Sequence, residues 1–153
     1  MIRHIIYVIL IAGVLFAPVN RVDVGALQPV EVISVYHNKG QVIVETDTGD
    51  IGQGKELEAA LVDLMATASA VVYLDTAAYL LIDSGTDEEI SILKERLKGS
   101  TKVAMIMGHL DLKDVDSYLK AHNDFPVIRE WKSGEKLPIL TSEKIFKKVE
   151  NKA

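Results

Sequence analysis

The chain of 153 residues contains no cysteine, only four prolines and a single tryptophan. Without a thiol it can form no disulfide and accept no lipid on a cysteine, so its folded part must be held together by its core alone. The scarcity of proline and a hydrophobic content of 48% argue against a disordered stalk and indicate a packed globular domain.

Positive charge is also in short supply. The sequence holds 17 lysines and arginines against 22 aspartates and glutamates, and beyond residues 1–26, which contain Arg3, Arg21 and Asp23, 15 remain against 21. Such a chain repels the phosphates of a nucleic acid, so we expect no nucleic-acid partner. Residues 129–153 reverse the balance, with 7 basic and 4 acidic side chains. We expect a solvated terminal helix over 142–152, and contact with anionic lipid headgroups is the alternative.

The N-terminus has the layout of an export signal. Arg3 and His4 are followed by an uncharged, apolar run of 15 residues, Ile5–Val19, which matches the basic and hydrophobic regions of such signals. The run is shorter than the roughly 20 residues that span a bilayer, although Arg3 can reach the headgroups. We expect residues 1–19 to contact the membrane as a single-pass anchor with the N-terminus inside.

Cleavage of this signal would change the location of the protein. Pro18 disfavours cleavage after Ala17, and the small residues of Val24–Ala26 fit the cleavage pattern but lie beyond a polar stretch. We expect an uncleaved anchor and linker over residues 1–26 and a single domain over residues 27–153 outside the cytoplasm. Cleavage would give a secreted protein, and a buried core helix is the third reading.

Hydrophobic periodicity predicts an α/β fold, with α+β as the alternative. Two β-branched runs, 31–36 and 41–45, flank His37–Gly40 and predict a β-hairpin. A glycine-rich connector, 47–54, follows it. Helices are expected over 55–68, 87–97 and 113–122, strands over 71–74, 79–82 and 102–107, and a last hairpin over 126–131 and 137–140.

These elements predict one mixed sheet. It would hold the N-terminal hairpin, about three helices packed on it, and a C-terminal hairpin or short helix. Alternation of strands and helices between residues 71 and 122 favours parallel crossovers in its centre. Helix 55–68 has Leu57, Ala60, Leu61, Leu64, Met65 and Ala68 on one face. The expected core includes Leu61, Leu64, Leu81, Leu93, Val103 and Ile106.

Two Asp-(Ser/Thr)-Gly tripeptides resemble the signature of aspartic peptidases. Asp83–Gly85 follows the apolar run Tyr79–Ile82, and Asp47–Gly49 follows a second apolar run. In such an enzyme the two carboxylates share a proton and activate water. Only 25 residues separate Asp83 from Gly108, where a later apolar-glycine element would end, and a predicted helix and strand already occupy them.

The first tripeptide has a simpler structural explanation. Ser84 or Thr86 can cap the helix that follows, whose first turn carries the acidic residues 87–89, as the helix dipole favours. We therefore expect no catalytic residue, and a small exported peptidase is the alternative.

Metal binding is not expected either. The candidate ligands His109, Asp111, Asp114 and His122 lie close in sequence, but their loop-and-helix spacing gives no convergent set. Asp111 is better explained as the N-cap of the following helix. The acidic residues Glu45, Asp47 and Asp50 miss the spacing of a calcium loop, and turn formation accounts for them.

Three segments resemble a known family in their order and apolar pattern. They are Gly54–Leu64 (GKELEAALVDL), Ala70–Ile82 (AVVYLDTAAYLLI) and Lys102–Val115 (KVAMIMGHLDLKDV), preceded by the hairpin Val32–Val44. This pattern resembles the N-terminal domain of the C-subunit lipoproteins of spore nutrient germinant receptors. The chain differs in lacking the lipidated cysteine and in carrying Asp75-Thr76 where that family has Gly-His.

The resemblance implies a non-catalytic, membrane-attached protein of endospore-forming bacteria that contacts partner subunits. It assigns no binding residue, because none of the matching positions is chemically specific. We therefore expect a membrane-anchored, extracytoplasmic interaction module linked to sporulation or germination, with no cofactor and no metal. The alternatives are the exported peptidase and a domain that binds a lipid or cell-wall surface.

Overall fold

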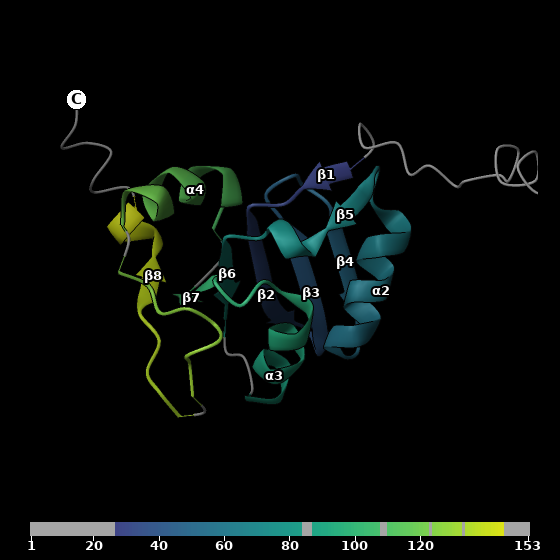
Figure 1. Cartoon of the computed structure of the whole chain (residues 1–153). Coiled ribbons are helices and arrows are strands. Elements are labelled where there is room, and N and C mark those ends of the chain that lie inside the picture. The colour runs from purple at the N-terminus through teal and green to yellow at the C-terminus, as the bar shows by residue number, and fades with distance from the viewer. Residues whose placement is uncertain (1–26, 84–86, 108–109, 123, 133, 146–153) are drawn as a thin grey trace, which may run out of the picture.

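A computed structural model describes residues 27–83, 87–107, 110–122, 124–132 and 134–145. They form a mixed α/β fold, as predicted (Figure 1). The strands form two sheets and not the one sheet that was expected: six strands pair in the order β4-β3-β2-β6-β7-β8, and the strand predicted over 71–74 is β5, which pairs with β1. The strands are β1 (Leu27–Pro29), β2 (Val32–Asn38), β3 (Gln41–Thr46), β4 (Ile51–Gly54), β5 (Val71–Tyr73), β6 (Tyr79–Ile82), β7 (Lys102–Met107) and β8 (Ile139–Thr141). The helices are α2 (Leu57–Thr67), α3 (Asp87–Arg96), α4 (Leu112–Ala121) and the 3-10 turn η2 (Leu74–Thr76).

The predicted N-terminal hairpin is confirmed. β2 and β3 pair antiparallel across a two-residue turn in which Lys39 and Gly40 both have positive φ, 51° and 79°. Such turns match the right-handed twist of the flanking strands. On its other side β2 pairs parallel with β6, which pairs parallel with β7, so the expected parallel centre is also present. The sheet changes from antiparallel to parallel at β2.

The two-stranded sheet contains the first strand of the described chain. β1 pairs parallel with β5 over three residues, with Leu27 opposite Val71 and Pro29 opposite Tyr73. Val30, the residue after β1, is held by a side chain of η2. The Thr76 hydroxyl lies 3.0 Å from both the backbone nitrogen and the carbonyl oxygen of Val30.

The glycine-rich stretch 47–54 was predicted to be a connector. Its second half instead forms strand β4 at one edge of the main sheet. Strand formation was hidden by Gly52 and Gly54, which lower β propensity. Their missing side chains have a packing role. A Cβ atom on Gly52 would lie 2.2 Å from the carbonyl oxygen of Ala60, and one on Gly54 would lie 2.5 Å from the Ala60 nitrogen. Only glycine therefore lets the backbone of α2 rest directly on β4.

The core has two parts, one on each face of the main sheet. α2 and α3 pack on one face through Leu57, Leu61, Leu64, Ile90, Leu93 and Leu97, whereas α4 packs on the other through Leu112, Val115 and Leu119. The six predicted core residues are all buried: Leu61, Leu64, Leu81, Leu93, Val103 and Ile106. Met65 was wrongly placed inward, because it lies on the outer side of α2 and is 50% exposed.

The predicted C-terminal hairpin is wrong. Val127 makes only an isolated bridge to Lys102, and β8 instead pairs parallel with β7. The segment between them is anchored by its apolar side chains, since Ile128, Trp131 and Leu137 join the α2–α3 core. Residues 142–145 are helical, and the rest of the terminal helix predicted over 142–152 lies outside the described residues.

The packing of α2 on β4 generates the first prediction. Gly52→Ala should destabilise the domain by about 3 kcal/mol or more, because its Cβ would overlap backbone atoms that cannot rotate away. The free energy of unfolding from urea titration measures this effect. Gly99→Ala is the matched control, since its Cβ would meet nothing closer than an arginine side-chain carbon at 3.5 Å. Equal stability of the two variants would contradict this description of the contact.

Candidate functional site

One face of the main sheet is only partly covered. Side chains alternate along β2, so that Val32 packs into the α4 core, whereas Ser34, Tyr36 and Asn38 continue the same face toward the carboxyl end of the strand. There they line a pocket instead of meeting a helix. The carboxyl ends of parallel strands are the usual location of binding sites in open α/β sheets.

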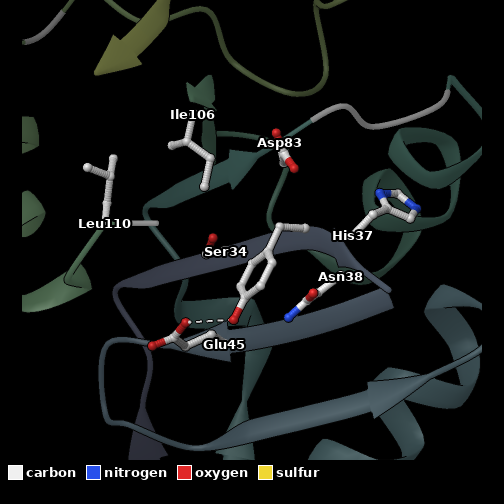
Figure 2. A pocket seen from close by; sticks show the side chains of 8 residues that line it. Ser34, His37, Asn38, Glu45, Asp83, Ile106 and Leu110 are labelled. Carbon is white, nitrogen blue, oxygen red and sulfur yellow. Dashed lines mark hydrogen bonds between the residues drawn. The ribbon is translucent and has the colours of Figure 1, made fainter. Parts of the chain in front are cut away.

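The pocket has a volume of about 450 Å³ (Figure 2). This volume falls within the range of small-molecule pockets, roughly 300–1,000 Å³. Its lining comes from β2, β3, the ends of β6 and β7, and the start of the segment that leads to α4. The lining residues are Ser34, Tyr36, His37, Asn38, Glu45, Asp83, Ile106 and Leu110.

The phenol of Tyr36 and the carboxylate of Glu45 are the paired polar groups in this pocket. The Tyr36 hydroxyl donates a long hydrogen bond of 3.4 Å to Glu45 Oε2 (Figure 2). Burial raises the pKa of Tyr36, and the negative charge of Glu45 and the hydrogen bond to it raise this pKa further. The phenol therefore stays protonated and acts as a donor.

Two other side chains in the pocket form no hydrogen bond to a described residue. Ser34 is only 2% exposed, yet its hydroxyl has no hydrogen-bond partner among the described residues. The carboxylate of Asp83 has no partner there either, although the Asp83 backbone nitrogen donates to the carbonyl of Val35. Among the described residues, the buried side-chain atom without a partner is Asp116 Oδ1, so the Ser34 hydroxyl keeps access to solvent through the pocket.

His37 borders the pocket but points toward the opposite face of the sheet. Its Nε2 lies 2.9 Å from Glu89 of α3, a contact that ties the end of β2 to that helix. In Figure 2 the ring lies away from Tyr36 and Glu45. His37 is thus a structural contact and not a base aimed at the pocket.

The two aspartates of the peptidase alternative lie at different ends of β2. Asp47 is fixed at its start, where its nitrogen donates to Val32 and its carboxylate accepts from the Glu31 nitrogen. Asp83 is fixed beyond Val35, on the opposite side of β2. Three residues of strand amount to about 10 Å, so the backbone anchors of the two residues are too far apart for carboxylates that share a proton. Ser84 and Thr86, the expected helix caps, lie outside the described residues.

Asp111 and His122, two of the four candidate metal ligands, are engaged locally. Asp111 caps α4 as predicted, accepting from the Lys113 nitrogen at 3.0 Å, and His122 Nδ1 contacts the carbonyl of Tyr118. Asp50 accepts from Thr48 within the turn before β4. In the part of the chain that the structure describes, which omits His109, no three histidine or carboxylate side chains converge as a metal site.

A second feature is a set of exposed apolar side chains on β4, α2 and β5, elements that lie on the same side of the molecule in Figure 1. Seven large hydrophobic side chains are exposed in the described residues, and five of them belong to this short stretch of chain. We name these five the apolar surface: Ile51, Val62, Met65, Val71 and Tyr73. The end of α2 lies against the start of β4, since the Thr67 hydroxyl donates to the carbonyl of Ile51.

Sequence reasoning missed both the pocket and the apolar surface. Ser34, Tyr36 and Asn38 recur at every second position of a strand whose other positions are mainly apolar. That spacing is a readable sign of a polar strip on one sheet face. The apolar surface was not recognised because Val62 and Met65 belong to a helix whose other apolar side chains already form a complete buried face.

Within the described residues, no helix is long and apolar enough to cross a membrane. The anchor that we expect lies in residues 1–26, outside them.

The Tyr36–Glu45 pair gives a prediction on titration. Glu45→Gln should lower the pKa of Tyr36, because it removes the negative charge that opposes ionisation of the phenol. The pKa should still remain above its ordinary value, since burial is the largest cause of the shift. Carbon NMR of labelled tyrosine, with Tyr36→Phe for assignment, measures it. An unchanged pKa in Glu45→Gln would show that the two groups do not interact.

Comparison of this chain with protein-family models, with curated proteins and with solved structures found no match. A functional proposal therefore has to come from the residues and their geometry, together with the pattern of the sequence.

Proposed function

We propose that the chain is a non-catalytic, membrane-anchored interaction module that acts outside the cytoplasm by binding a protein partner. The observation that carries the proposal is the apolar surface formed by Ile51, Val62, Met65, Val71 and Tyr73. Exposed hydrophobic side chains are ordinary when scattered, but those gathered on one side of a domain mark interaction sites.

The helix α2 is the centre of this surface. Its inner face is buried through Leu57, Leu61 and Leu64, whereas its outer face carries Val62, 67% exposed, and Met65. A surface helix normally presents polar side chains to water opposite its buried stripe. Apolar side chains on both faces suit a helix that is covered from outside by a partner.

The hydrogen bonds already made to the edge strand β4 indicate how a partner would bind. The two backbone groups of β4 that α2 side chains bind are the Gln53 nitrogen, which donates to Asp63 at 2.9 Å, and the Ile51 carbonyl, which accepts from Thr67. Since an occupied edge offers little to an added strand, the partner binds the side chains of α2 and β5.

The position of the surface fits a partner in the same membrane. Residues 1–26 lead directly into β1, which pairs with β5, the strand that carries Val71 and Tyr73. An anchor at residues 1–19 would leave only residues 20–26 as a linker, at most about 25 Å when fully extended. The apolar surface would then lie near the bilayer, within reach of a membrane-attached subunit.

The biological setting that we propose is sporulation or germination. It rests on the resemblance of Gly54–Leu64, Ala70–Ile82 and Lys102–Val115 to the C-subunit domain of germinant receptors. The glycines before the helix have a physical reason in this chain, because Gly52 and Gly54 allow α2 to sit on β4.

Anchoring is testable by fractionation. The full chain should stay in the membrane fraction through high-salt washing, because salt screens charge but does not weaken the burial of an apolar run. Immunoblotting of washed membranes measures this. Recovery of a soluble form that begins at Leu27 would contradict the anchor and indicate a secreted protein.

Partner binding is testable by charging the apolar surface. Val62→Glu with Met65→Glu should abolish the complex that the tagged chain forms in the membranes of its own cells, because two charges would be buried at the contact. Native electrophoresis after mild detergent extraction measures the loss. The thermal midpoint should fall little, since both side chains are solvent-exposed on the helix.

Met107→Glu is the matched control, because Met107 is 60% exposed but belongs to β7, away from the apolar surface. Migration of the wild-type chain as a lone protomer would contradict the proposal. Binding of the wild-type chain to protein-free lipid vesicles, lost in the double variant, would instead favour the alternative of a lipid-surface domain.

A further inference from the structure

We propose that the apolar surface of one copy of this chain binds the basic C-terminal segment, residues 146–153, of a second copy. The inference rests on the proposed function and deepens it, because it names the partner of the same surface. Residues 146–153 lie outside the described residues. What bears on the contact is their sequence and the place where the described chain ends.

Acidic side chains accompany the apolar surface. Residues 50–75, which contain β4, α2 and β5, include five acidic side chains and one lysine. Glu58 lies one helical turn before Val62 on α2, and the exposed Asp75 follows Tyr73 by two residues. Arg96 of α3, 3.7 Å from Glu58, offsets one of these negative charges. A partner that covers the surface therefore gains from carrying positive charge beside its apolar side chains.

Two of these carboxylates are held in place by the backbone. Asp63, the neighbour of Val62, accepts from the Gln53 nitrogen at 2.9 Å. Asp50, the neighbour of Ile51, accepts from the Ser69 nitrogen at 3.3 Å. Because both carboxylates are already ordered in the free domain, a cationic partner does not have to order them when it binds.

The C-terminal segment has the complementary composition. Its sequence, FKKVENKA, holds three lysines and one glutamate together with the apolar residues Phe146 and Val149. On the helix expected over 142–152, Phe146 and Val149 would lie one turn apart, as would Lys148 and Lys152. A short stretch of chain thus combines the apolar side chains and the positive charge that the acidic, apolar surface selects.

The segment cannot cover the apolar surface of its own chain. It begins at the β8 edge of the sheet, where the Lys144 amine donates to the Ile139 carbonyl and Ile145 is buried in the core on the α4 face. The apolar surface lies at the β4 edge and on α2, which packs on the other face (Figure 1). With neighbouring strands about 4.8 Å apart, the two edges of the six-stranded sheet are separated by about 24 Å.

The reach of the segment is shorter than this separation. Val149 is four residues beyond Ile145 and can lie at most about 14 Å from it. Phe146 and Val149 therefore meet an apolar surface only on a second copy. Since both copies would be anchored through residues 1–19, the contact would join neighbours in one membrane.

Charge reversal on each side of the contact, followed by mixing, tests the inference. The full chain would be purified in an uncharged detergent, and its association followed by sedimentation velocity over a range of concentrations. We expect the wild type to self-associate. Glu58→Lys with Asp75→Lys should weaken this association about tenfold or more, and so should Lys147→Glu with Lys148→Glu, because like charges then face each other.

A mixture of the two double variants should associate as the wild type does, because the basic segment of the first variant meets the acidic surface of the second. Restored association also shows that both variants are folded. Glu95→Lys with Glu130→Lys is the matched control, since it makes the same change of net charge at exposed positions outside the apolar surface. This control should associate as the wild type does.

Three results would overturn the inference. They are a wild-type chain that stays a protomer at every concentration, association that neither reversal weakens, and two weakened variants whose mixture stays protomeric. Loss of binding to phosphatidylglycerol vesicles in Lys147→Glu with Lys148→Glu, with self-association unchanged, would instead assign the basic segment to anionic lipid.

Failure of this inference is distinguishable from failure of the docking function. A complex in the cell membrane that is lost in Val62→Glu with Met65→Glu, but persists in Lys147→Glu with Lys148→Glu, would leave the docking function standing. It would show that the partner is not the C-terminal segment of a second copy.

Discussion

The contact of α2 with β4 through Gly52 and Gly54 is the constraint on which the rest of the structure depends. Because neither glycine has a Cβ, the helix backbone approaches the edge strand closely, and Leu57, Leu61 and Leu64 reach the core below. This approach also brings Asp63 and Thr67 to the backbone of β4. This contact thus fixes the helix, occupies two backbone groups of the edge strand and leaves Val62 and Met65 facing outward.

The opposite face of the sheet is organised by what α4 leaves uncovered. α4 buries the part of that face around Tyr79, Leu81 and Ala104, and the pocket opens where β2 continues past it. The pocket and the apolar surface therefore arise from different causes. The first results from incomplete coverage of a sheet face, and the second from apolar side chains of α2, β4 and β5 that the core does not use.

The regular elements could be predicted from the sequence because their signals are local. The hairpin 32–46, the three helices and the strands at Tyr79–Ile82 and Lys102–Met107 follow from periodicity and turn chemistry. β4 could not, because a strand made of Ile-Gly-Gln-Gly has no β-forming pattern and exists only through its contacts with β3 and α2. The C-terminal hairpin failed for a similar reason, since Ile128 and Trp131 gain more from the distant core than from pairing with β8.

The candidate site was harder to predict than the fold. Ser34, Glu45 and Asp83 lie on three separate elements, and only the order β3-β2-β6 in the sheet brings them to one pocket. Asp47 and Asp83, which look related in sequence, lie at different ends of β2 for the same topological reason. Residue type alone therefore does not show which carboxylates the fold brings to one pocket.

The pairing of β1 with β5 has a mechanical consequence. A force on the chain from its N-terminal side would act first on the pairing of β1 with β5, which covers only three residues. The Thr76 hydroxyl adds one further hydrogen bond, which it accepts from the Val30 nitrogen. Two-stranded sheets are weak on their own, so this pairing should yield under tension well before the six-stranded sheet does. Unpairing of β1 would then release the chain as far as Val30, while the six-stranded sheet and the pocket on it remain folded.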